Sequence, residues 1–445
     1  MRMIADSLLN ENTSGSKWTV FNTVGMVGLP VLLLAMIYTA NYTLLYAVIG
    51  LSLLFLNKPE VLFPTYYAAS LSSSFSVIGD GVSAARYLSL IMILSSLLCV
   101  NKGVLKSKDL VVFVIVVVFT FLSTVLGYDG KITFFFVMLQ NLLVFFLFSL
   151  CVKVDYEKLI YGLVFVSFLV VLLLFLQARN AGAFMFMERY NDDDSINANN
   201  LAMMIAQCSA FSIAYALFGK KNLIRILCVG ISIATVLLVL ATGSRTSLIA
   251  ISMALIIGIF FRYGQSNIFL KVVIVLAVTF AFLKASQSIM DSGSQVLNRF
   301  SYENIAEDGG AGRLTDLTII VTKIMPDHLL FGSGIGGSNM KALGREYGLP
   351  NLSHNIIIDP LSQMGVIGYI IYLFLLIPII SKCKTIIRYR NVSYLPLFAF
   401  LALITAIING LGETVFYEKF FWNDLGLCVL AFNIYYTNGK IQKLS

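Results

Sequence analysis

Residues 159–176 read LIYGLVFVSFLVVLLLFL, a continuous run without a single charged side chain. One helix needs about 20 apolar residues to cross the hydrocarbon core of a bilayer, and this run meets that need. The rest of the chain has a similar composition, because 58% of its 445 residues are hydrophobic and only 12% are charged. A soluble domain carries about 25% charged residues. The sequence therefore predicts an integral membrane protein.

Apolar runs of helical length recur along the whole chain and predict about fourteen membrane spans. We place them at residues 22–40, 42–57, 60–78, 84–100, 109–127, 131–153, 157–178, 199–218, 223–242, 246–262, 267–285, 361–381, 393–411 and 418–436. The run at 60–78 is rich in serine and gives the weakest signal. The predicted fold is an all-α polytopic membrane protein, with residues 1–445 forming a single transmembrane domain.

The basic residues between these runs predict the orientation of the chain. They lie in short connectors, namely Lys102, Lys106, Lys108, Lys153, Lys158, Lys220, Lys221, Arg225, Arg262, Lys382, Lys384, Arg388 and Arg390. Short basic connectors stay on the cytoplasmic side of a membrane. Both termini are then cytoplasmic, and the net charge of +8 reflects topology and not a nucleic-acid partner.

One connector on the opposite, outer face is much longer than the others and spans about residues 286–360. Long loops in compact proteins are usually functional or disordered. This one is not of low complexity, and apolar residues at helical spacing predict a helix over 313–325 that ends at Pro326. FGSGIGG at 331–337 is expected to form a flexible turn. We expect the loop to fold as a cap over an active-site cavity.

Two residues that frame this loop are candidates for chemistry. Arg245, in ATGSRTSLI, lies between two apolar runs, where a charge is costly unless it is paired or faces water. An arginine there can hold a phosphate with two hydrogen bonds, or it can snorkel to the interface. His354, in SHN, lies where the loop re-enters the membrane and is suited to proton transfer. Alternatively, it merely precedes a helix that Ser353 or Asn355 caps.

Further charged residues lie on the same predicted side. Four arginines there would suit a polyanionic lipid head group, and they are Arg179, Arg189, Arg245 and Arg313. Glu413 either lines the same cavity or is simply hydrated. The run Asp192–Asp194 contains the short DxD pattern of metal-dependent sugar transferases, but a solvated acidic loop is the preferred interpretation. Two histidines and six scattered cysteines predict no metal site.

Five short motifs then follow one another in a characteristic order. They are T-G-S-R (Thr242 to Arg245), G-R (Gly312 and Arg313), L-F-G-x-G-x-G (Leu330 to Gly336), S-H-N (Ser353 to Asn355) and M-G-V-I-G (Met364 to Gly368). This order resembles the O-antigen polymerase and O-antigen ligase superfamily of bacterial envelope glycan assembly. The resemblance covers roughly residues 195–380, and Asn199 to Ala202 are similar to the P-N-x-x-A element of that superfamily, with Ala198 in place of the proline. Asp316 and Leu317 depart from the ligase pattern, where a tryptophan often stands.

The resemblance implies a membrane glycosyltransferase of GT-C-like architecture in the bacterial inner membrane. Its donor would be a glycan linked by pyrophosphate to undecaprenol, used on the periplasmic face without a metal or cofactor. Arg245 and Arg313 would contact the pyrophosphate, with Arg189 as a looser match, and His354 would act as the base. We add Asn199, Asn355 and Glu413 as supporting residues of this site. The implied partners are a lipid-linked acceptor, membrane lipid and a chain-length regulator protein.

The motifs leave several functions open. A polymerase joins lipid-linked repeat units, and we favour this function. A ligase with the same chemistry moves the finished glycan to lipid A-core, and the motifs do not encode the acceptor. A flippase for lipid-linked glycans would place charges through its central helices, whereas here they gather at one face. A receptor-like or structural protein would leave the long loop unexplained.

Overall fold

The computed structural model describes residues 20–39, 41–71, 77–78, 82–101, 103–127, 131–180, 183, 198–262, 296, 318–335, 355–388, 395–413 and 415–437. Within them the helices are α2 (Val20–Thr39), α3 (Tyr42–Ser52), α4 (Pro59–Leu71), α5 (Ala84–Cys99), α6 (Ser107–Leu126), α7 (Ile132–Ser149), α8 (Tyr156–Asn180), α9 (Ala198–Phe218), α10 (Asn222–Thr242), α11 (Arg245–Arg262), α16 (Met325–Asp327), α18 (Ile358–Arg388), α19 (Leu395–Gly410) and α20 (Lys419–Phe432). The 3₁₀ helix η1 (Leu53–Phe55) extends α3, and the π-helices η3 (Ile320–Ile324) and η4 (Asn433–Thr437) adjoin α16 and α20. Eight of these helices are long and apolar enough to cross a membrane, as expected of a polytopic membrane protein.

The helices follow the predicted apolar runs closely. Each helix from α2 to α11 and from α18 to α20 overlaps one run. The serine-rich run at 60–78 is the clearest departure, because α4 ends at Leu71 and the strands β1 (Val77–Ile78) and β2 (Val82–Ser83) pair in a short antiparallel hairpin. The run at 267–285 lies outside the described residues, so the count of fourteen spans stays a prediction.

Four helices form the centre of the bundle. Every residue of α4 is buried, and α9, α19 and α20 are buried along nearly their whole length. By contrast, only 28% of the most apolar 18-residue stretch of α10 is buried within the protein. The corresponding share for α6 is 33%. The central helix α9 is less apolar than α8, with a mean hydropathy of 1.7 against 3.0. Small and polar residues favour close packing of helices in a membrane, which explains this arrangement.

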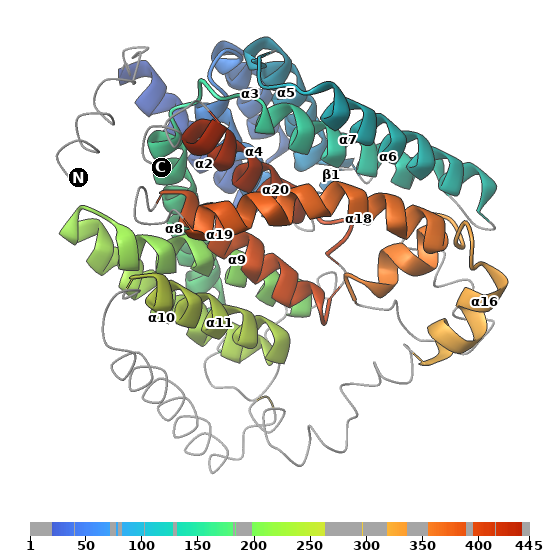
Figure 1. Ribbon diagram of the computed structural model, residues 1–445. Helices are drawn as coiled ribbons and strands as arrows, with labels where there is room; N and C mark the ends of the chain where they lie inside the picture. The colour runs from blue at the N-terminus through green and yellow to red at the C-terminus, as the bar shows by residue number, and fades with distance from the viewer. Residues whose placement is uncertain are drawn as a thin grey trace.

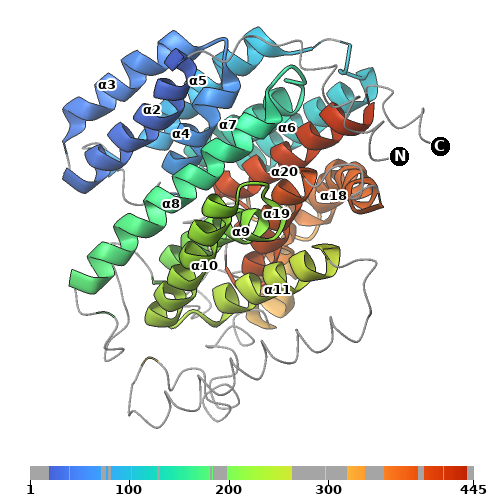
Figure 2. The same ribbon diagram turned by 90° about the vertical axis from the view of Figure 1, so that its left-hand side faces the viewer.

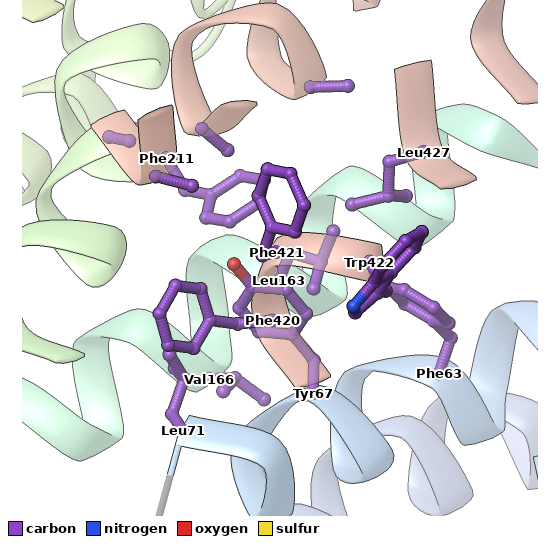
Figure 3. Packing of buried hydrophobic residues seen from close by; sticks show 14 of the residues in the cluster. Phe63, Tyr67, Leu71, Leu163, Val166, Phe211, Phe420, Phe421, Trp422 and Leu427 are labelled. Carbon is purple, nitrogen blue, oxygen red and sulfur yellow. The ribbon is translucent and has the colours of Figure 1, made fainter. Parts of the chain in front are cut away.

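Packing around the centre joins segments that are far apart in the sequence. Helix α9 packs against α8, α10, α11 and α19, while α20 packs against α4, α7, α18 and α19. Figure 2 shows α9, α10 and α11 next to one another, and Figure 1 shows α18 crossing the bundle near α20. Large aromatic side chains fill the space between the central helices, among them Tyr67 on α4, Phe211 on α9 and Phe421 on α20 (Figure 3).

Tight turns define the two ends of the bundle. Helices α9 and α10 are joined by residues 219–221, and α10 and α11 by residues 243–244. The three helices therefore run antiparallel, and α9 and α11 begin at the same end. We call this the Arg245 end, because α11 begins there at Arg245, and we call the other the Arg262 end, because α11 finishes there at Arg262.

Candidate functional site

Arg245 occupies the first position of α11, directly after the turn from α10. Gly243 ends α10 with a φ of 68° and donates its backbone N–H to the Leu240 carbonyl at 3.0 Å. Only glycine adopts this left-handed conformation readily, which explains the T-G-S-R motif locally. The turn leaves Arg245 half-buried at the end of the bundle, and not in the middle of a helix.

A chain of hydrogen bonds connects the start of α11 to the end of α19. The Ser244 hydroxyl donates to Ser247 Oγ at 3.3 Å, and the Ser247 hydroxyl donates to Asn409 Oδ1 at 2.9 Å. All three side chains are buried, with exposed fractions of 3% or less. Hydrogen bonds among buried polar groups of neighbouring helices hold those helices in a defined register. The end of α19 therefore lies beside the helix start that carries Arg245.

The start of α18 binds to the same end of α19. The Ile356 backbone N–H donates to the Gly410 carbonyl at 2.6 Å, and Asn355 Nδ2 donates to the Leu411 carbonyl at 3.3 Å. Asn355 also caps α18, because its Oδ1 accepts from the backbone N–H of Ile357 at 2.9 Å and of Ile358 at 3.3 Å. The alternative interpretation of the S-H-N motif, in which Ser353 or Asn355 caps the next helix, is therefore observed for Asn355.

Gly410 is the point where these segments meet most closely. A Cβ at this position would lie 2.5 Å from Val415 Cγ2 and 3.0 Å from Ile356 Cβ. No side chain fits into that space. Residues Asn409, Gly410 and Leu411, which we call the α19 junction, thus contact both the helix start at Arg245 and the residues that directly follow His354.

The other predicted site residues are distributed as follows. Glu413 lies just beyond the α19 junction and is only 1% exposed, so it is not a hydrated surface residue. Asn199 is half-buried in the first turn of α9, at the Arg245 end. His354, Arg313, Arg189 and the acidic run at 192–194 lie outside the described residues. Within the part that is described, no group of three or more histidine, cysteine, aspartate or glutamate residues is placed to hold a metal ion.

In the connection from α19 to α20, Glu413, Val415 and Phe416 are buried in the interior of the bundle. Asn141, near the middle of α7, donates from Nδ2 to the Tyr417 carbonyl at 3.1 Å, and the Tyr417 ring packs edge-on to Phe134. Lys419 begins α20 and is only 8% exposed. This buried cation was not among the site residues predicted from the sequence. Lys419 directly follows Glu418 at the start of the apolar run at 418–436, and this pair of charges is its local signal in the sequence.

The loop segment before His354 docks on α18 by its backbone. Helix α18 is broken at Gly365, whose φ of 66° and ψ of −176° are not helical. The N–H groups of Val366 and Ile367 therefore lack their usual partners one turn earlier. They donate instead to the carbonyls of Leu329 at 2.8 Å and Leu330 at 3.3 Å.

The carbonyl groups freed by the same break find partners in the same loop segment. The Ser362 carbonyl accepts from the Ser333 N–H at 3.0 Å, and the Gln363 carbonyl accepts from the Gly334 N–H at 3.0 Å. The Ser123 hydroxyl on α6 also donates to the Gln363 carbonyl at 3.0 Å. Buried backbone groups must be hydrogen-bonded, most strictly in a membrane. The loop segment thus satisfies the groups that the kink exposes.

We call this arrangement, Leu329 to Ile335 on the kink at Gly365, the glycine clamp. A Cβ on Gly332 would overlap the backbone of Gln363, and a Cβ on Gly365 would overlap the backbone of Leu330. Gly332 and Gly365 both have a positive φ. The expectation of a flexible turn is therefore wrong for residues 331–335, since backbone hydrogen bonds and close packing hold them.

The helix before the clamp also differs from expectation. The π-helix η3 carries the chain into α16, and Pro326 lies inside α16 instead of ending the helix. The Met325 N–H bonds to the Ile320 carbonyl, five residues earlier. Proline disrupts a regular helix because it lacks an N–H and its ring clashes with the preceding turn. A wider turn just before Pro326 accommodates it, and α16 ends one residue later, at Asp327.

Comparison with known proteins finds a family match that overlaps this part of the chain. Residues 230–373 match the family model described as O-Antigen ligase. The matched segment begins within α10, ends within α18 and lies inside the range of the resemblance seen in the sequence. It contains Arg245, Asn355 and the glycine clamp, but not the α19 junction. A search of curated proteins finds no match. The family match supports the relation of this chain to the superfamily of O-antigen polymerases and O-antigen ligases, glycosyltransferase-like membrane enzymes that act on lipid-linked glycans.

Proposed function

We propose that this protein is a membrane glycosyltransferase that polymerises lipid-linked oligosaccharide repeat units. One observation carries the proposal. The α19 junction contacts, through Asn409 and Gly410, both the helix start at Arg245 and the residues that directly follow His354. A cation for a diphosphate and a base for a hydroxyl proton are the two groups that such a transfer needs. Arg245 and Asn355, the residue that follows His354, lie on either side of this junction. In the sequence, Arg245 and His354 both fall within the segment that matches the family model.

The reaction follows from these groups. The acceptor hydroxyl oxygen attacks the anomeric carbon of the donor glycan, and a new glycosidic bond forms as the bond to the polyprenyl diphosphate breaks. The electron pair of the broken bond stays on the diphosphate. Arg245 and Arg313, with Arg189, would stabilise that growing charge. His354 would accept the hydroxyl proton, help that is typically worth about 10²–10⁴-fold in rate.

The setting of the reaction belongs to the same proposal. The chain would cross the bacterial inner membrane fourteen times, with both termini in the cytoplasm and the Arg245 end on the periplasmic face. The donor and acceptor would both be linked to undecaprenyl pyrophosphate, and no metal takes part. A chain-length regulator would bind the protein and limit the product.

Two substitutions and one matched control test the proposal in cells. We expect His354→Ala and Arg245→Ala each to abolish the long-chain glycan, as seen on a gel of the cell envelope. Arg262→Ala, at the exposed opposite end of the same helix α11, is expected to leave the glycan ladder unchanged. The amount of protein in the membrane is measured for each variant. A full glycan ladder in the His354→Ala cells would overturn the catalytic assignment.

The printed description of the family model, O-Antigen ligase, favours a second candidate. A ligase would transfer the finished glycan to lipid A-core by the same chemistry. Deleting the gene separates the two functions on one gel. Loss of a polymerase leaves a single repeat unit on the acceptor, whereas loss of a ligase leaves none.

A further inference from the structure

The side-chain amide of Asn409 lies at the centre of the α19 junction, against the start of α11. It is fully buried, and its Oδ1 accepts the Ser247 hydroxyl at 2.9 Å. The oxygen of Ser247 in turn accepts from the Ser244 hydroxyl at 3.3 Å. The direction of this chain from Ser244 to Ser247 to Asn409 places the oxygen of the amide toward α11. The Asn409 NH₂ group therefore faces away from Ser247.

That NH₂ group is an unused pair of donors. Among the residues that the structure describes, Asn409 Nδ2 has no hydrogen-bond partner. Leaving a buried donor unpaired is unfavourable, and most buried polar groups in native proteins are paired. A donor of this kind, held in place by two serines, is prepared for an acceptor that arrives with a ligand.

We propose that Asn409 is a further substrate-binding residue, whose Nδ2 donates to a phosphate oxygen of the polyprenyl diphosphate. The inference rests on the proposed function. The position of Asn409 supports a phosphate oxygen as the acceptor. Asn409 is hydrogen-bonded to Ser247, which is two residues after Arg245. A neutral donor adds to the grip of an arginine without repelling it, and hydrogen bonds to an anion are stronger than those between neutral groups. The bond strengthens as charge develops on the leaving group.

The test compares two variants that remove the same protein–protein hydrogen bond. Asn409→Leu removes the bond to Ser247 and the free donors together. Ser247→Ala removes the bond but keeps the donors. The full-length protein is purified, and thermal stabilisation by undecaprenyl diphosphate is titrated to obtain its affinity. Phosphatidylglycerol serves as a second probe, since a phospholipid head group offers similar phosphate oxygens.

We expect Asn409→Leu to weaken the affinity for undecaprenyl diphosphate about tenfold or more. Ser247→Ala is expected to weaken it by less than about threefold, because the donors remain. Without ligand, Asn409→Leu melts at or above the temperature of Ser247→Ala, since it replaces an unpaired buried donor with an apolar group. A residue that only ties two helices together would not show this combination.

Three results would overturn the inference. One is an unchanged affinity in Asn409→Leu, another is an equal loss in the two variants, and the third is equal stabilisation of the parent protein by phosphatidylglycerol. Failure of the proposed function looks different. If Arg245→Ala and His354→Ala cells kept a full glycan ladder while Asn409→Leu lost undecaprenyl diphosphate binding, the phosphate site would stand and the transferase assignment would fall.

Discussion

Single polar side chains inside the bundle have partners that make their removal costly. Asp424 on α20 is fully buried, and its Oδ1 accepts the Tyr67 hydroxyl from α4 at 2.9 Å. With its amide oriented to satisfy both of its groups, Gln207 on α9 donates to Asp424 Oδ2 at 3.1 Å and accepts from the Ala406 N–H at 2.9 Å. A carboxyl group within a membrane is tolerated only with such partners. This group of hydrogen bonds connects all four central helices, α4, α9, α19 and α20.

A double-mutant cycle tests this connection. We expect Tyr67→Phe to lower the stability by about 1–3 kcal/mol, because it leaves a buried carboxyl oxygen unpaired. In an Asp424→Leu background the same substitution is expected to be neutral or stabilising, since the Tyr67 hydroxyl has by then lost its acceptor. Thermal unfolding of the purified protein measures both effects. Tyr46→Phe, at a residue that is 70% exposed, is the control and is expected to change little. Equal losses from Tyr67→Phe in both backgrounds would contradict the connection.

Residues at the site differ in how far the sequence could predict them. Arg245 and Asn355 are marked by local signals, a charge between two apolar runs and a capping residue before a helix. Asn409 carries no such signal, because it is an ordinary polar residue at the end of an apolar run. Its importance comes from Ser247, which is 162 residues away in the sequence. Contacts over such distances depend on how the helices pack, and a single sequence does not reveal that.

At the scale of elements, the break in α18 and the loop segment that fills it form one unit. Hydropathy predicted the helix, since residues 361–381 are apolar, but it did not predict the kink. The M-G-V-I-G motif reads as part of a regular span, and L-F-G-x-G-x-G reads as a free turn. The two motifs depend on each other. The kink at Gly365 leaves backbone N–H and carbonyl groups of α18 without helical partners, and residues 329–334 form hydrogen bonds to them. The two motifs of the resemblance are therefore two halves of the glycine clamp.

The clamp predicts a large difference between two identical substitutions. Gly365 has backbone angles that are essentially restricted to glycine, at a strain of about 1–3 kcal/mol for other residues. We expect Gly365→Ala to lower the melting temperature, to expose the outer loop to protease and to reduce the glycan ladder. Gly230→Ala in α10 is the control, because nothing lies within 4 Å of a Cβ there. Equal protease resistance in the two variants would show that the clamp does not hold the loop.

At the scale of the whole molecule, the positions of helix ends limit how the chain can pass through the membrane. Helix α11 begins beside the α19 junction and runs for 18 residues, a length of about 27 Å, to Arg262 at the opposite end of the bundle. Helix α18 also begins at the α19 junction, at the same end of the bundle as the start of α11. We therefore predict that the chain returns across the membrane an odd number of times between Arg262 and Asn355. The apolar run at 267–285 is the segment of that stretch with the length and composition of a span.

This return crossing can be tested by labelling single cysteines in right-side-out membrane vesicles. Arg262 and Lys323 are both exposed, one on each side of the predicted span. With Cys99 replaced by serine, the remaining native cysteines are buried and label weakly. We expect a maleimide that cannot cross membranes to label Lys323→Cys from outside and Arg262→Cys only after the vesicles are opened. If both cysteines were labelled from the same side, residues 267–285 would not cross the membrane. The prediction of fourteen spans would then be wrong, and both termini could no longer lie on the same face as Arg262.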